Sequence, residues 1–129
     1  MLGNENENKY FDLVEKANEH IDKEEYEKAE KILLEASKLN KEGYYQIAEM
    51  YRYISIEEAI KKYEVAYEKG IAKAASNIGS YYYINKDTEK AKIWIQKAID
   101  GGDVNSNFHM GELYDNARDL KKAYEYYSK

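Results

Sequence analysis

The chain has 129 residues and a net charge of −5, with 43% hydrophobic and 35% charged residues, a profile typical of a folded protein with a strongly charged surface. It contains no cysteine, which excludes disulfides, thiolate nucleophiles and cysteine-based zinc sites. Its acidic excess lies within residues 1–36, and no apolar run approaches the roughly 20 residues that span a membrane, so neither a nucleic-acid partner nor a membrane segment is expected.

The polar, acidic residues 1–7 differ from a secretory signal peptide, and we expect them to form a flexible tail of a cytoplasmic protein. From residue 8 onward the chain has no proline and is rich in Glu, Lys and Ala, which favours long helices. Their connections are short, which makes neighbouring helices antiparallel hairpins. The eight predicted helices lie at 8–21, 25–40, 43–54, 56–69, 72–84, 88–100, 104–115 and 119–128.

A short motif recurs along these helices: an apolar residue, a small residue, two variable residues and a tyrosine. The motif runs from Ile47 to Tyr51, then from Ile78 to Tyr82 and from Met110 to Tyr114, so its copies are almost evenly spaced. An alanine that opens the following helix recurs at a constant interval at Ala59, Ala91 and Ala123, and Ala29 marks a degenerate leading unit. Two motifs in phase predict one repeat domain over 8–129, with units at 8–40, 41–71, 72–103 and 104–129.

Glycine fills the small position of the motif at Gly79 and Gly111. A glycine in the middle of a helix costs about 1 kcal/mol relative to alanine. The recurrence of this cost at one repeat position predicts that the paired helix passes close to each glycine. Gly70 and the pair Gly101–Gly102 are instead expected where second helices end in a left-handed residue.

Helix–turn–helix units with these small and aromatic positions resemble tetratricopeptide (TPR) repeats. The leading unit resembles the first half of a TPR through Ala17-Asn18-Glu19 and Tyr26-Glu27-Lys28-Ala29. Residues 72–114 are more similar to a Sel1-like repeat, on the evidence of Lys90-Ala91-Lys92-Ile93-Trp94, Gly101-Gly102-Asp103 and Met110-Gly111-Glu112-Leu113-Tyr114. The repeat of this chain is shorter than the TPR period of about 34 residues, and it lacks the glycine-rich loop of Sel1-like repeats at residues 83–87.

The resemblance implies an all-α fold, a right-handed α-solenoid of about four antiparallel helix hairpins. It also implies an adaptor or scaffold whose concave face, lined by the first helices, binds a peptide or a partner's helix. A self-assembly module that stacks end to end is the alternative, and a helical-repeat RNA binder is disfavoured by the negative charge.

The residues expected to bind the partner lie on the first helices, at equivalent or adjacent turns of successive units. Ser76 and Ser80, between the larger Tyr45 and Phe108, are expected to leave a hollow for an apolar anchor of the partner. The full set is Asn18, Tyr45, Glu49, Arg52, Ser76, Ser80, Tyr83, Phe108, Glu112 and Asp115.

The last helix carries three tyrosines at positions that a further repeat would cover in a longer solenoid. Some of Tyr124, Tyr126 and Tyr127 are therefore expected to stay exposed. Such exposure predicts a homodimer through this end, or a natural chain that continues further.

Catalytic and metal chemistry have few candidates. His109, Glu112 and Asp115 at helical spacing could share a divalent ion, but the residues equivalent to His109 in the other units, Gln46 and Asn77, are ordinary polar surface residues. No serine lies in a Gly-x-Ser-x-Gly motif, and no glycine-rich phosphate loop is present. The sequence therefore predicts a protein that is not an enzyme and holds neither cofactor nor metal.

Overall fold

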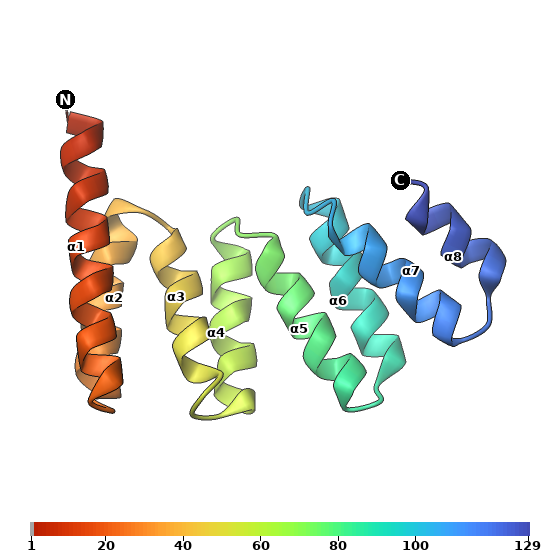
Figure 1. Cartoon of the computed structure of the whole chain (residues 1–129), viewed down its shortest axis with the longest axis horizontal. Coiled ribbons are helices and arrows are strands. Elements are labelled where there is room, and N and C mark those ends of the chain that lie inside the picture. The colour runs from red at the N-terminus through yellow and green to blue at the C-terminus, as the bar shows by residue number, and fades with distance from the viewer. Residues whose placement is uncertain (1) are drawn as a thin grey trace. The chain divides into compact units, whose positions relative to one another are not determined.

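The computed structural model describes residues 2–129, with side chains from Asn4 onward, and this part of the chain contains helices and turns but no strand. The all-helical fold and the order of its helices are as the sequence predicts. The helices are α1 (Leu2–Asp22), α2 (Tyr26–Leu39), α3 (Glu42–Tyr51), α4 (Ile56–Glu68), α5 (Lys73–Ile84), α6 (Thr88–Asp100), α7 (Ser106–Asn116) and α8 (Leu120–Tyr127) (Figure 1).

Helix α1 is longer than its apolar pattern indicated. It begins at Leu2, so residues 2–7, which were assigned to a tail, form its first turns. Residues 4–9 are exposed, and the first buried side chain is that of Tyr10. Because this segment buries no side chain, the apolar pattern of the sequence did not predict that it is helical. The acidic Glu5 in the first turn favours a helix there, because it interacts with the positive end of the helix dipole.

The chain forms two compact units, the first ending at Lys69 and the second running from Gly70 to Lys129. This division falls close to the predicted boundary between the second and third repeats. Each unit contains two hairpins of antiparallel helices, α1–α2 with α3–α4 and α5–α6 with α7–α8 (Figure 1). Within each unit the two hairpins also contact each other, α2 against α3 and α6 against α7.

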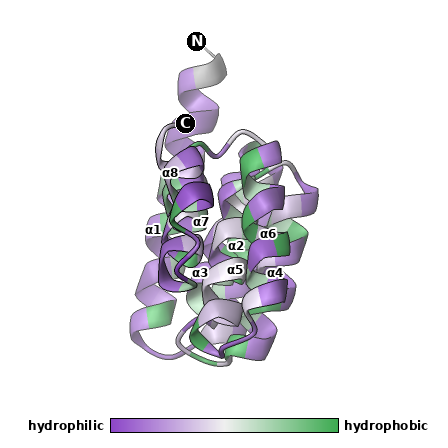
Figure 2. Cartoon of the chain, turned by 90° about the vertical axis from the view of Figure 1, so that its right-hand side faces the viewer, coloured by the Kyte–Doolittle hydropathy of each residue, from purple (hydrophilic) through white to green (hydrophobic). Residues whose placement is uncertain are grey.

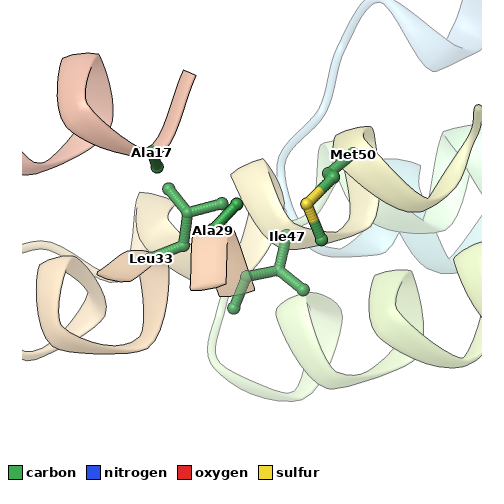
Figure 3. Packing of buried hydrophobic residues seen from close by; sticks show 5 residues of the cluster. All are labelled: Ala17, Ala29, Leu33, Ile47 and Met50. Carbon is green, nitrogen blue, oxygen red and sulfur yellow. The ribbon is translucent and has the colours of Figure 1, made fainter. Parts of the chain in front are cut away.

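The first unit has its own apolar core, built from three helices. Ala17 of α1, Ala29 and Leu33 of α2, and Ile47 and Met50 of α3 pack together and are at most 3% exposed (Figure 3). Ile47 is the apolar residue of the repeat motif, and Ala29 is the alanine that recurs near the start of each second helix. Both repeat positions thus lie in the core, as helical periodicity predicts.

The second unit repeats this arrangement with α6 and α7. Ala91 and Ile95 of α6 meet Met110 and Leu113 of α7, and all four are at most 3% exposed. Hydrophobic and hydrophilic residues alternate along the helices, as in amphipathic helices that pack on one side (Figure 2).

The motif glycines lie where another helix passes, as the sequence predicts. A Cβ atom on Gly79 would lie 2.6 Å from Cγ1 of Ile95, and one on Gly111 would lie 2.5 Å from the ring of Tyr127. Both distances are well below the roughly 3.5–4.0 Å of a carbon–carbon contact. A side chain at either position would therefore displace the side chain of Ile95 or the ring of Tyr127.

Candidate partner-binding surface

Three of the side chains predicted to bind a partner, those of Tyr45, Glu49 and Arg52, lie together in the first unit. The ring of Tyr45 meets the ring of Tyr63 edge-on, with 5.5 Å between their centroids. The Tyr63 hydroxyl donates to Oε1 of Glu49 at 3.0 Å, and Nη1 of Arg52 donates to Oε2 at 3.1 Å. Asn18 is exposed on α1 and is not one of the side chains that meet at Glu49.

The second unit contains a pocket of about 250 Å³ between the first helices of its two hairpins. Its floor is apolar, because Ile95 of α6 and Leu113 of α7 lie there at 2% and 3% exposure. The walls come from the C-terminal half of α5 and the facing side of α7. The lining residues are Ser80, Tyr83, Ile84, Ile95, His109, Glu112, Leu113 and Asn116.

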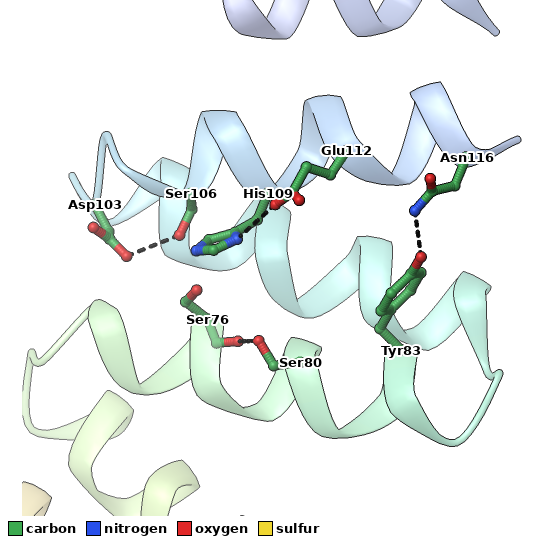
Figure 4. Close-up of polar contacts among 8 residues, drawn as sticks. All are labelled: Ser76, Ser80, Tyr83, Asp103, Ser106, His109, Glu112 and Asn116. Atoms are coloured by element: carbon green, nitrogen blue, oxygen red, sulfur yellow. Dashed lines mark hydrogen bonds and ion pairs between the residues drawn. The ribbon is translucent and has the colours of Figure 1, made fainter. Parts of the chain in front are cut away.

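Polar contacts fix the walls of this pocket (Figure 4). Nδ2 of Asn116 donates a hydrogen bond to the Tyr83 hydroxyl, which joins α7 to the end of α5. On α7, His109 and Glu112 are paired, with 3.4 Å between Nδ1 and Oε1. The Ser80 hydroxyl donates to the Ser76 carbonyl of its own helix at 3.1 Å, so its small side chain leaves space above the apolar floor.

A pocket lies beside Ser80, but neither of the large side chains expected to flank the hollow, Tyr45 and Phe108, lines it, and Ser76 does not line it either. His109 lines it in place of Phe108, whose ring lies 5.5 Å from that of Tyr127 on the side of α8. Asp115 also faces α8, where burial, followed by the charges of Asp115 and Glu112, raises the pKa of Tyr127. Phe108, Gly111 and Asp115 lie three and four residues apart on α7, so they share the side of the helix that meets Tyr127 of α8.

The last hairpin exposes a group of large apolar side chains. On α8, Tyr124 is 73% exposed, Leu120 is 64% and Tyr127 is 42%, and Phe108 of α7 is 58% exposed beside them. Tyr126 is not part of this face: its ring stacks on Tyr114, and its hydroxyl donates to Oε1 of Gln96 at 3.2 Å.

No protein-family model matches the chain, and comparison with curated proteins gives no match either. Solved structures do match it. A crystal structure of MamA has a TM-score of 0.64 at 19% identity, covering 92% of this chain and 74% of that one. MamA (41-end) from Desulfovibrio magneticus RS-1 has a TM-score of 0.60 at 22% identity, covering 90% and 70%. A tetratricopeptide repeat protein from Parabacteroides merdae ATCC 43184 has a TM-score of 0.65 at 21% identity, covering 94% and 52%.

The chain has a TPR-like helical-repeat fold. At these identities the likeness concerns the fold alone, and the similarity of residues 72–114 to a Sel1-like repeat remains a prediction. TPR-like chains of known structure thus match more than nine-tenths of its length. The function has to be argued from the surfaces that this fold presents.

Among residues 2–129, no three His, Cys, Asp or Glu side chains come together in a way that could hold a metal ion, the trio around His109 included. No helix in the same range is both long enough and apolar enough to cross a membrane.

Proposed function

We propose that this protein is an interaction module that binds a peptide or helix of a partner protein, with the α5–α7 pocket taking one apolar side chain. The observation that carries the proposal is the apolar floor of Ile95 and Leu113, open between polar walls. Pockets for drug-sized ligands have about 300–1,000 Å³. At about 250 Å³, this pocket is of a size for a single side chain that a partner contributes.

The polar walls would orient the partner, while the floor would supply most of the affinity. Tyr83 of α5 stands at one wall, and His109, Glu112 and Asn116 of α7 stand at the other, which offers both hydrogen-bond donors and acceptors. An apolar anchor that fills a desolvated pocket inside a polar rim is the usual composition of an interface hot spot.

A peptide library displayed on phage can test this proposal. We expect selection on the protein to enrich peptides with one shared large apolar residue, and these peptides should bind Ser80→Trp, whose side chain fills the pocket, more weakly than the parent. Tyr83→Ala should weaken their binding by more than about 1 kcal/mol, as loss of a hot-spot wall does. Tyr45→Ala and Phe108→Ala serve as comparisons, since neither residue lines the pocket.

Circular dichroism should show unchanged helicity in each variant. Ile93→Ala on α6 is a matched control, because Ile93 is an exposed apolar side chain of the same unit outside the pocket. Peptides that bind Ser80→Trp as tightly as the parent, or that lose affinity only with Ile93→Ala, would show that another face is the working one.

Self-association through the last hairpin is a second candidate function, favoured by the exposure of Leu120, Tyr124 and Tyr127. The residue one repeat before Tyr127 is Ile95, which is only 2% exposed because α7 covers it. We infer that a second copy covers the same position on α8 and forms a homodimer. Sedimentation mass should then rise with concentration and fall to that of a monomer in Leu120→Lys/Tyr124→Lys; a parent chain that stays monomeric at high concentration contradicts it.

A further inference from the structure

The first unit contains a groove of about 540 Å³ that the function proposed above does not use. It is formed by the turn between α1 and α2, the first turn of α2, and the end of α3 with the turn that follows. Tyr26, Tyr51 and Ile54 supply its apolar walls. Next to Ile54 in the same turn, Tyr53 is 80% exposed and does not line the groove.

The rim of this groove is acidic. Glu24, Glu25 and Glu27 lie on it, against the single cation of Lys28. Glu25 is the one carboxylate that is paired: Oε1 lies 3.0 Å from Nδ1 of His20, and Oε2 accepts from Nζ of Lys28 at 3.2 Å. In the part of the chain that the structure describes, Glu24 and Glu27 form no ion pair, so the rim keeps two uncompensated negative charges.

The aromatic wall lies in the field of these charges. The Tyr51 hydroxyl donates to Oε1 of Glu30 at 2.7 Å, and this bond is the largest cause that raises the pKa of Tyr51 to about 12. Burial and the charges of Glu30, Glu58 and Glu27 contribute the rest of this increase. Glu30 beside this wall is ion-paired with Nζ of Lys62 at 2.9 Å, so the uncompensated negative charge of the groove lies on its rim, at Glu24 and Glu27.

The same ring already binds a cation of its own chain. Nζ of Lys62 lies 5.2 Å from the centroid of the Tyr51 ring, within the range of a cation–π contact. That face of the ring is therefore occupied, and Glu24 and Glu27 on the rim are the groups that would attract an ammonium or guanidinium group and repel a carboxylate or phosphate.

We propose that this groove docks a basic amphipathic segment of a partner protein, with an apolar side chain against Tyr26 and Ile54 and Lys or Arg side chains on Glu24 and Glu27. The apolar walls give the segment a place to desolvate, and the acidic rim sets its orientation and speeds its encounter. The site is in the first unit, and it does not depend on the α5–α7 pocket.

The test uses the whole chain and a fluorescein-labelled helical peptide with lysines on one face and leucines and one tryptophan on the other. Fluorescence anisotropy should show saturable binding that weakens as NaCl rises from about 50 to about 300 mM, because salt screens the rim charges. Glu24→Lys/Glu27→Lys should weaken binding by at least about tenfold. Ile54→Ser should weaken it by at least about fivefold, because the apolar wall is lost.

The matched control is Glu15→Lys/Glu35→Lys, which changes the net charge equally at exposed positions outside the groove. It should retain the parent affinity within about threefold, since exposed charges farther away are screened. An equal loss in this control, or an unchanged affinity in Ile54→Ser, would show attraction by net charge alone and overturn the proposal. So would equal binding of the same peptide with glutamates in place of lysines.

Self-association is tested in the same variants without peptide. If Glu24→Lys/Glu27→Lys abolishes a concentration-dependent mass while the parent binds no peptide, a second copy occupies the groove and the proposal is wrong. If Glu24→Lys/Glu27→Lys keeps the concentration-dependent mass of the parent but loses affinity for the peptide, the result supports the proposal.

Discussion

At the scale of single residues, Asn107 is a buried side chain whose carbonyl oxygen Oδ1 has no hydrogen-bond partner among the described residues. Its nitrogen Nδ2 donates to the Val104 carbonyl at 3.2 Å. That contact identifies the amide atom beside Val104 as the nitrogen, because the Val104 carbonyl oxygen can only accept a hydrogen bond. The unpartnered group is thus an acceptor, and a buried acceptor without a donor costs about 1–3 kcal/mol.

Asn107→Ala should therefore raise the free energy of unfolding by about 1 kcal/mol, because removing the orphan acceptor outweighs the lost bond to Val104. The chain itself shows that alanine fits, since the equivalent residue of the preceding repeat is Ala75, which is fully buried. Urea denaturation measures the change. Asn105→Ala, at an exposed position in the same turn, should alter it by less than about 0.5 kcal/mol. A loss of stability in Asn107→Ala would mean that Oδ1 has a partner in solution.

Neighbouring residues on α7 show where prediction from sequence stops. The motif at Met110 and Gly111 predicted the buried side of the helix, and both residues are buried. Phe108 and His109 point about 100° apart on a helix, so either could have lined the pocket. The choice depends on the ring of Tyr127 against Gly111, a contact between two different helices that the periodicity within α7 does not contain.

At the scale of elements, the turns inside three of the four hairpins share one strained feature. Glu24, Lys86 and Arg118 have φ angles of 59°, 65° and 65°. A side chain in this left-handed region costs about 1–2 kcal/mol, and glycine avoids that cost. Lys86 and Arg118 occupy equivalent positions of successive repeats, so the turn recurs with the repeat.

Lys86→Gly and Arg118→Gly should each stabilise the protein by about 0.5–1 kcal/mol, the relief of strain less the entropy that glycine adds to the unfolded chain. Thermal or urea unfolding measures this change. Asn85→Gly is the matched control, because Asn85 precedes Lys86 with a φ of −82°. It should destabilise by about 0.5–1 kcal/mol. Stabilisation by all three variants would refute the argument from left-handed strain.

The elements themselves were largely predictable because their causes are local. Spacing of alanines and motif residues located all eight helices, and short connections between them required antiparallel hairpins. The start of α1 was missed because residues 4–9 bury no side chain. The groove at Tyr26, Tyr51 and Ile54 was missed because it joins turns of different hairpins, which no single repeat motif describes.

At the scale of the whole molecule, ionic networks between helices make stability depend on pH at both ends of the range. Burial alone would raise the pKa of Glu30, but hydrogen bonds from Lys62 and Tyr51 and the charge of Lys62 outweigh it and lower that pKa. The hydrogen bond from His20 is the largest cause that lowers the pKa of Glu25. The stabilisation that ionised Glu25 and Glu30 give the folded protein is present above the ordinary pKa of a glutamate. It is lost as the pH falls through the lowered pKa values of these two residues.

At high pH the protein is expected to lose stability as the pH rises, and this loss comes chiefly from the ionisation of Tyr51. Its pKa is about 12 in the folded protein against 10.0 ordinarily, so the folded state holds the proton more tightly. Stability should be full below pH 10 and should fall as pH rises toward about 12. Two pKa units correspond to about 2.7 kcal/mol. Solvent screening at this half-buried site reduces the expected loss to about 1 kcal/mol.

Urea denaturation at pH 8 and at pH 11.5 or so tests this, with Tyr51→Phe against the parent. The variant should be less stable than the parent at pH 8 by about 1 kcal/mol, the worth of its bond to the Glu30 carboxylate. The difference should shrink at the higher pH, because the parent then loses the same interaction as its tyrosine ionises. Tyr53→Phe is the matched control: Tyr53 is 80% exposed in the turn just beyond Tyr51, so both its stability and its pH dependence should follow those of the parent. A constant difference between Tyr51→Phe and the parent across this range would mean that the Tyr51–Glu30 bond does not govern the loss of stability at high pH.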